Sequence, residues 1–368
     1  MTNDTATPVY TKFMQILVGL VALFFILFIG RPIILPLVFA TLIAILLNPL
    51  VNWLTRRRVG RVLSILLSLV LGMALVAGLL FFFISQASHF SEAMPLLREK
   101  TITLLQSGVA WVSERFNVDR SQVDAWLAKS KSAGMSSGMS VLSQTLGAVS
   151  SVLVTLLLLP VYTFLILFYK PLLMDFLRQL FQRDRHEVVA EVLLETKSLV
   201  QNYLLGLLIE AAIVAALNTT GLLLIGVPYA FLLGTLGALL NMIPYIGGII
   251  AIALPVIMAL VSLSPTAALL VIGAYMLVQF IDNNIIVPRI VASRVKLNAL
   301  VSIVIVLVGG ALWGVPGMFL SIPLTAIVKV IFDRIDYLKP WGFLLGDTMP
   351  PIGRTIFKMP SMPRGRKV

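Results

Sequence analysis

Long apolar segments alternate with short polar or basic ones along the chain, a pattern typical of membrane-spanning helices. A helix that crosses the hydrocarbon core of a bilayer needs about 20 mostly apolar residues. The first half of the chain holds four such segments, at about 13–29, 33–54, 62–85 and 142–169. Further apolar segments fill the second half. We therefore predict an all-α polytopic membrane protein with about eight apolar segments.

The second half begins with an apolar span, Tyr203 to Ile225, that contains Glu210. The apolar stretch after it, 228–263, is too long for one ordinary span and carries Pro255 in its second arm. Its centre reads Asn241-Met-Ile-Pro244-Tyr245-Ile-Gly247-Gly248. Proline and paired glycines at such a place indicate a broken helix or a hairpin.

A later pair of segments has the same plan. The span 268–287 is followed by an over-long stretch, 300–330, with Pro323 in its second arm. Polar residues inside this span are Gln279, Asp282, Asn283 and Asn284, and the break in the stretch runs over Gly309, Gly310, Gly314 and Gly317. Glu210 and Asp282 are 72 residues apart, Gly247 and Gly317 are 70 apart, and Pro255 and Pro323 are 68 apart. These offsets predict an internal repeat of span plus broken-helix hairpin.

Basic residues predict the orientation of the spans, because loops on the cytoplasmic side carry an excess of Lys and Arg. The run from Arg56 to Arg61 lies between the second and third spans, which places the N-terminus in the cytoplasm. If each over-long stretch is a re-entrant hairpin, the basic loop 289–296 is also cytoplasmic and the two units are inverted. If each is a single crossing, that loop lies outside. The charge favours hairpins, and the C-terminus is cytoplasmic in both cases.

The polar segments complete a division of the chain into regions. Two amphipathic regions are expected, one extracytoplasmic and rich in helical periodicity, the other cytoplasmic. In order, the regions are N-terminal spans 1–85, extracytoplasmic helices 86–140, a fourth span 141–169, a cytoplasmic helix 170–200, a core of two units 201–333 and a basic cytoplasmic tail 334–368.

Composition supports a membrane protein and excludes several kinds of chemistry. Hydrophobic residues make up 59% of the chain and charged residues 12%, whereas soluble domains have about 25% charged residues. The net charge of +12 is concentrated at the ends of apolar segments, so nucleic acid is not an expected partner. There is no cysteine, both histidines lie outside the apolar segments, and no phosphate-binding loop of the ATPase type is present. We expect no cofactor, no metal and no catalytic residue.

Glu210 and Asp282 are the candidate functional acids. Of the 16 acidic residues, only these two lie well inside apolar spans. A charged side chain at the centre of a membrane helix costs about 2.5–3.5 kcal/mol on insertion scales, so it tends to face the interior of the bundle. A carboxyl group held there can alternate between binding a proton and binding a cation. The alternative is that the acids and their neighbouring amides only connect helices through hydrogen bonds.

Residues near the two acids are candidates to line a substrate path, or else to pack between helices. The glycines and two prolines are assigned to backbone breaks and close helix approach. The candidate path residues are Asn241, Pro244, Tyr245, Gln279, Asn283, Asn284 and Arg289, and the candidate break residues are Gly247, Gly248, Pro255, Gly309, Gly310, Gly314, Gly317 and Pro323. Inverted repeats with discontinuous helices are typical of secondary transporters.

Three ordered motifs resemble those of the autoinducer-2 exporter family of bacterial PerM-like permeases. The first is Pro244-Tyr245-Ile-Gly247 and the second is Gln279-x-x-Asp282-Asn283 with Pro288-Arg289. The third is Gly309-Gly310-x-x-x-Gly314-x-x-Gly317, followed by Pro323. The resemblance covers nearly the whole chain. It implies a transporter of the bacterial inner membrane, surrounded by lipid, that assembles as a homo-oligomer.

The resemblance implies export of a small polar molecule such as autoinducer-2, or exchange of Na⁺ or Li⁺ for protons. A second hypothesis is a membrane scaffold or assembly protein that transports nothing. A third is an intramembrane aspartyl protease, since two neighbouring carboxyl groups can share a proton. One of the two acids is a glutamate and no Gly-x-Gly-Asp element surrounds Asp282, which argues against an enzyme.

Overall fold

The computed structural model describes residues 9–86, 103, 157–243, 247–290 and 297–348. Every regular element in these ranges is a helix, which confirms the all-α prediction for this part of the chain. The predicted extracytoplasmic region, apart from Thr103, lies outside the described residues. The same is true of Pro244 and Tyr245.

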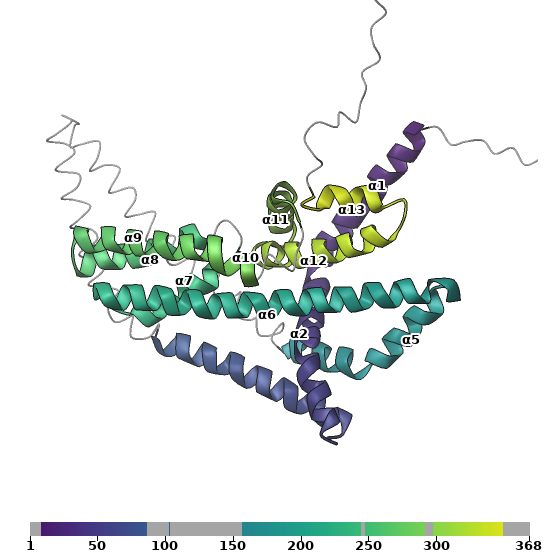
Figure 1. Ribbon diagram of the computed structural model, residues 1–368, viewed down its shortest axis with the longest axis horizontal. Helices are drawn as coiled ribbons and strands as arrows, with labels where there is room; N and C mark the ends of the chain where they lie inside the picture. The colour runs from purple at the N-terminus through teal and green to yellow at the C-terminus, as the bar shows by residue number, and fades with distance from the viewer. Residues whose placement is uncertain (1–8, 87–102, 104–156, 244–246, 291–296, 349–368) are drawn as a thin grey trace, which may run out of the picture.

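Three long helices open the described chain, close to the predicted spans. They are α1 (Val9–Ile29), α2 (Arg31–Arg56) and the helix Arg61–Gln86. Pro32 stands in the first turn of α2, where a proline does not interrupt helical hydrogen bonding. In Figure 1, α2 crosses the long helix α6 (His186–Ile225) steeply.

The chain then bends before it enters α6. The helix Leu157–Phe168 meets α5 (Lys170–Leu180) at an angle of 61°. A short 3₁₀ turn, Arg183–Arg185, leads into α6, which is 40 residues long. The predicted region boundary at residue 200 falls inside this continuous helix. No proline or glycine occurs between His186 and Tyr203, so nothing in the backbone ends the helix there. It ends at Gly226, whose positive φ of 86° is a common helix terminator.

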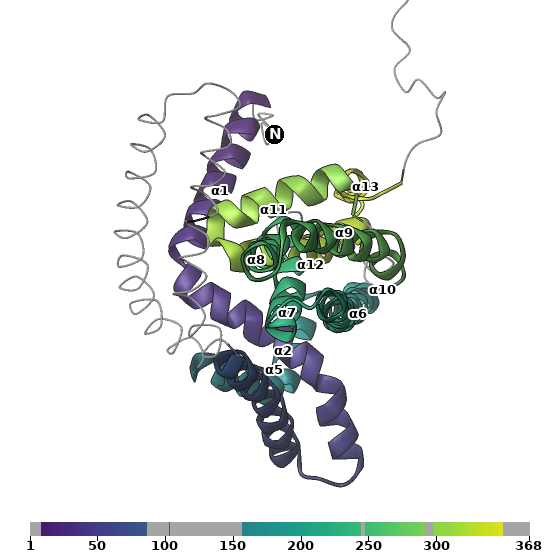
Figure 2. The ribbon, with the colours of Figure 1, turned by 90° about the vertical axis from the view of Figure 1, so that its left-hand side faces the viewer.

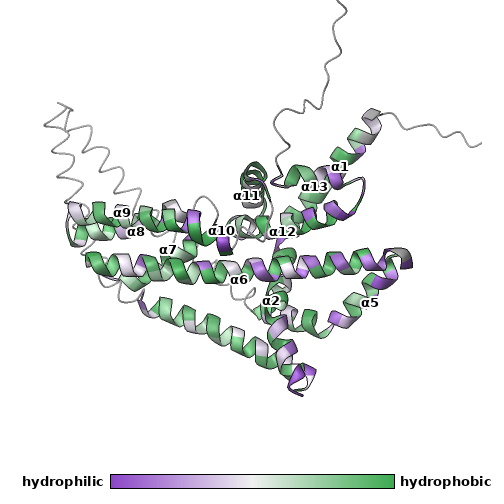
Figure 3. Cartoon of the chain, viewed as in Figure 1, coloured by the Kyte–Doolittle hydropathy of each residue, from purple (hydrophilic) through white to green (hydrophobic). Residues whose placement is uncertain are grey.

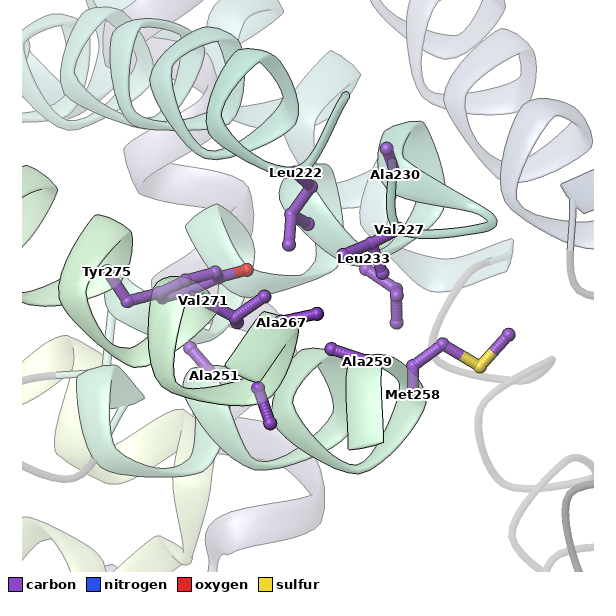
Figure 4. Close-up of a cluster of buried hydrophobic side chains, with 11 residues drawn as sticks. Leu222, Val227, Ala230, Leu233, Ala251, Met258, Ala259, Ala267, Val271 and Tyr275 are labelled. Atoms are coloured by element: carbon purple, nitrogen blue, oxygen red, sulfur yellow. The ribbon is translucent and has the colours of Figure 1, made fainter. Parts of the chain in front are cut away.

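α6 is followed by three helices, and Figure 2 shows α6, α8 and α9 nearly end-on. They are α7 (Ala230–Asn241), α8 (Gly247–Ser262) and α9 (Pro265–Ile281). The first and third of the three pack on the C-terminal part of α6, while the second packs on the other two. A buried apolar cluster fills the space between them (Figure 4). Leu222, Leu233, Ala259 and Val271 each come from a different one of the four helices, so this cluster fixes how they sit together.

The last helices form the second part of the core. They are a π-helical turn (Asp282–Ile286), α10 (Val287–Ile290), α11 (Ala299–Trp313), α12 (Val315–Arg334) and α13 (Lys339–Leu345). α11 and α12 fold back on each other at Gly314, which has a φ of 66°. A side chain on either Gly309 or Gly317 would overlap the carbonyl of the other, so both glycines permit the close approach of the two helices.

The two over-long stretches are thus folded-back helix pairs, α7 with α8 and α11 with α12. The break between the two helices of each pair covers fewer residues than the sequence predicts. Pro255 and Pro323 lie buried inside the uninterrupted α8 and α12, and Gly309 and Gly310 are helical. α7 ends at Asn241, before α8 begins at Gly247, and α11 gives way to α12 at Gly314.

Among the described residues, five helices are long and apolar enough to cross a membrane, or six if the pair bent at 61° forms one span. α7, α8 and α11 are shorter apolar helices. Hydrophobic residues cover most helices, while hydrophilic ones gather on α5 and the N-terminal half of α6 (Figure 3). The protein is a multi-pass membrane protein.

Gly317→Ala should lower the free energy of unfolding by about 1–3 kcal/mol, because the added methyl group overlaps the Gly309 carbonyl. Thermal unfolding of the purified protein in detergent measures the change. Gly273→Ala is the matched control, since nothing lies within 4 Å of a Cβ at Gly273. Equal unfolding temperatures for the two variants would contradict the close packing of α11 and α12.

Candidate functional site

The structure brings the two intramembrane acids together. Glu210 lies on the buried face of α6, and Asp282 opens the π-helical turn that follows α9. Their exposed fractions are 7% and 1%, and the two carboxyl groups interact electrostatically. α6 packs against both α9 and the π-helical turn. Residues 72 positions apart in the chain therefore belong to one site.

One oxygen of Asp282 is held and the other is left available. Asn241, the last residue of α7, donates a hydrogen bond from Nδ2 to Asp282 Oδ2 at 2.9 Å. Oδ1 of Asp282 is buried and has no hydrogen-bond partner among the described residues. A buried polar atom without a partner is costly, which is why such atoms are rare away from functional sites.

The π-helical turn is the local reason that Asp282 sits where it does. The amide of Val287 donates to the carbonyl of Asp282, five residues back rather than four. Nδ2 of Asn284 donates to the carbonyl of Phe280 at 2.8 Å, so an amide side chain satisfies a backbone acceptor at the irregularity. Consecutive Asp and Asn residues compete with regular helical hydrogen bonds. Single π-helical turns occur frequently at functional sites.

α8 approaches the site through Gly248. A Cβ at this position would lie 2.9 Å from Oε1 of Gln279 and 3.4 Å from Oδ1 of Asn241. Gln279 also donates to Oδ1 of Asn283 at 3.3 Å. Gly248 and Gln279 therefore lie beside Asn241, and Asn241 connects them to Asp282.

Other predicted path residues lie elsewhere. Asn283, Asn284 and Arg289 are exposed on the surface of the chain, and Arg289 is in α10, beyond the π-helical turn. Gly309 and Gly317 hold α11 against α12, because a Cβ on either would meet atoms of these two helices, and Gly314 forms the turn between the helices. The compact site is consequently smaller than the set of residues that the sequence motifs contain.

A second buried polar pair was missed in the sequence. Asn218 lies two turns after Glu210 on the buried face of α6, and Tyr275 lies two turns before Asp282 on α9. Gly237 of α7 lies between them, because a Cβ there would be 3.1 Å from Tyr275 Oη and 3.5 Å from Asn218 Nδ2. Asn218 Oδ1 and Tyr275 Oη have no hydrogen-bond partner in the described part of the chain. The eight-residue spacing of Asn218 from Glu210 is the signal that would have found this pair.

Tyr203 extends the same polar face of α6 in the other direction. It is 3% exposed, and its phenol interacts electrostatically with Glu210. Tyr203, Glu210 and Asn218 thus form a polar line along a helix whose other buried residues are mostly apolar. Within the described ranges, no group of three or more acidic or histidine side chains is placed to hold a metal ion.

Several apolar helices, folded-back helix pairs and a buried carboxyl pair between packed helices are the features of a multi-pass membrane transport protein. Comparison with known families agrees. The chain belongs to the AI-2E transporter family, whose model matches residues 16–336.

Individual relatives are similar over part of their length. The putative transport protein YrrI of Bacillus subtilis (strain 168) is 33% identical over 138 residues, 38% of each chain. The AI-2 transport protein TqsA of Escherichia coli (strain K12) is 37% identical over 121 residues, 33% of this chain and 35% of TqsA. The putative permease PerM of the same strain is 29% identical over 218 residues, 58% of this chain and 62% of PerM. Each alignment spans less than two thirds of the relative, and all three names describe transport proteins.

Asn241→Ala should lower the free energy of unfolding by about 1–3 kcal/mol, because it leaves the buried carboxyl of Asp282 without its donor. Thermal unfolding in detergent measures the effect. Asn284→Ala is the control, since that side chain is exposed and, among the described residues, donates to the carbonyl of Phe280 four residues earlier. If Asn241→Ala were no more damaging than the control, the hydrogen bond to Asp282 would not hold the site.

Proposed function

We propose that this chain is a secondary transporter that exchanges protons for a monovalent cation or a small polar molecule at Asp282 and Glu210. One observation carries the proposal: two buried carboxyl groups from different helices lie close enough to interact electrostatically, and Oδ1 of Asp282 has no hydrogen-bond partner among the described residues. Ionisable groups within a bundle of membrane helices are otherwise rare and expensive.

The pair supplies the chemistry that exchange requires. Two neighbouring carboxylates repel each other, so together they favour binding a proton or a cation between them. Protonation neutralises the site and removes its attraction for the transported species. Loss of the proton restores a negative centre that binds Na⁺, Li⁺ or the hydroxyl donors of a polar substrate. Asn241 keeps Oδ2 of Asp282 fixed in both states, which leaves Oδ1 as the acceptor.

The arrangement of the core supports alternating access. In chain order, α6 is followed by the pair α7 and α8, and α9 with its π-helical turn is followed by the pair α11 and α12, so each of these two units contains one acid. We propose that the units form an inverted repeat and rock against each other around the acids. The same proposal places the protein in the bacterial inner membrane as a homo-oligomer, with both termini in the cytoplasm.

The choice of candidate substrates rests on similarity to known proteins and not on the geometry of the site. TqsA is named as an AI-2 transport protein, and this chain matches about a third of it. Autoinducer-2 or a similar small polar molecule is therefore one candidate substrate, beside Na⁺ and Li⁺. A scaffold that transports nothing is the alternative, and it does not account for two acids brought together in the apolar core.

Everted membrane vesicles test the proposal. Respiration acidifies the vesicle interior, and a pH-sensitive dye follows proton release when Na⁺, Li⁺ or autoinducer-2 is added. Wild-type protein should release protons on addition of its substrate. Asp282→Asn should reduce the response to that of vesicles without the protein, and Glu210→Gln should lower it, because each change removes a group that binds and releases the proton.

Glu187→Gln is the matched control, since Glu187 lies on the same helix as Glu210 but is exposed. It should leave the response unchanged. If the wild-type protein releases no protons after any of these additions, proton-coupled exchange is refuted. A full response from Asp282→Asn would instead refute the assignment of the site.

A further inference from the structure

Four helices meet at a cationic cluster far from the two acids. Arg61 begins its helix, Lys170 begins α5, and Lys197 lies in the N-terminal half of α6. Lys197 precedes Glu210 by 13 residues, roughly 20 Å along the helix axis. The cluster is therefore separate from the proposed transport site.

A buried amide forms the floor of this cluster. Asn48, in the middle of α2, is 5% exposed and accepts a hydrogen bond from Lys170 Nζ to its Oδ1 at 2.9 Å. Its Nδ2 is buried without a hydrogen-bond partner among the described residues. The Asn48 side chain therefore has an N–H donor, close to the Lys170 ammonium, for which the described chain supplies no acceptor.

Arg61 is held at the same junction. Its Nη2 donates to the carbonyls of Leu167 at 2.9 Å and Phe168 at 3.2 Å, the last residues before the 61° bend into α5. A guanidinium has five N–H groups, so these two bonds from one nitrogen leave donors free for another acceptor. The bend places Lys170 immediately beyond the carbonyls that fix Arg61.

Within the described chain, the three cations are not paired with an acid. Lys197 and Arg61 are both close enough to repel the ammonium of Lys170. Among the described residues, none of the three forms an ion pair. The nearby acids pair elsewhere, Asp175 with Arg178 at 3.9 Å and Glu191 and Glu195 with Arg334 at 2.8 and 2.9 Å. Like charges gathered around a buried donor are unfavourable unless an anion neutralises them.

We propose that Asn48, Arg61, Lys170 and Lys197 form a binding site for a phosphate group, supplied by an anionic phospholipid or by free inorganic phosphate. Two ammonium groups supply charge, and the amide and guanidinium supply directed donors to phosphate oxygens. Basic pockets between membrane helices bind lipid headgroups in this manner. The bound phosphate joins α2, α5, α6 and the helix Arg61–Gln86 at one point.

The test uses purified full-length protein in detergent, with thermal unfolding as the measurement. Phosphatidylglycerol, phosphatidylcholine and inorganic phosphate are titrated separately at constant ionic strength, with chloride as the reference anion. A rise in unfolding temperature with phosphatidylglycerol alone assigns the site to an anionic lipid. A rise with inorganic phosphate as well assigns it to phosphate from either source. No rise beyond that given by phosphatidylcholine and chloride would overturn the proposal.

Variants show whether these residues are responsible. Lys170→Gln should weaken the response to the effective ligand by at least about tenfold in concentration. Arg178→Gln is the control, because Arg178 is on the same helix, is exposed and pairs with Asp175. It should respond like the wild type.

Asn48→Asp provides a second, independent test of the site in case Lys170→Gln does not fold. The new carboxylate supplies the missing counter-charge to Lys170, so this variant should be more stable without ligand and insensitive to phosphate. A full response in Asn48→Asp, or equal responses of Lys170→Gln and Arg178→Gln, would overturn the proposed site.

Discussion

Holding a carboxyl group inside an apolar helical bundle is the constraint on which the core of this protein depends. Asp282 is almost completely buried, and only Asn241 donates to it among the described residues. The surrounding elements determine where Asp282 lies and what it contacts. The π-helical turn presents the acid, the end of α7 supplies its donor, and Gly248 lets α8 come close. Glu210 faces it from α6, so four segments of the chain meet at one charge.

A second constraint comes from the backbone. In lipid, a helix can end only where its peptide groups find partners within the protein. α6 and α11 meet this requirement by ending at glycines, and the helix that follows each of them packs directly against it. Gly226 and Gly314 provide the left-handed backbone, while Gly309 and Gly317 provide contact between helix backbones. As a result, α7 packs beside the end of α6 and α12 packs beside the end of α11.

The sequence predicts much of this architecture, because hydrophobic segment length and glycine placement act locally. The second and third spans, both folded-back pairs and the positions of the two buried acids are evident from the pattern of residues. What it does not reveal depends on packing. A π-helical turn has the same composition as an α-helical one, so Asp282 appears only as a polar residue in a span. The pairing of Asn218 with Tyr275 across Gly237 needs the crossing of three helices. The continuity of α6 through residue 200 is not evident from the sequence, because the chain changes from polar to apolar there without a change of element.

The length of α6 has a mechanical consequence. Its 40 residues extend for about 60 Å, twice the roughly 30 Å thickness of the hydrocarbon core. Glu210 lies near the middle of α6. Near the N-terminal end of α6, Glu191 and Glu195 form ion pairs with Arg334 of α12. A rod pivoting at its middle by about 10° moves each tip by about 5 Å over half that length. If α6 pivots around the buried acids, small rearrangements there would produce larger displacements at its N-terminal end, where Arg334 of α12 pairs with it.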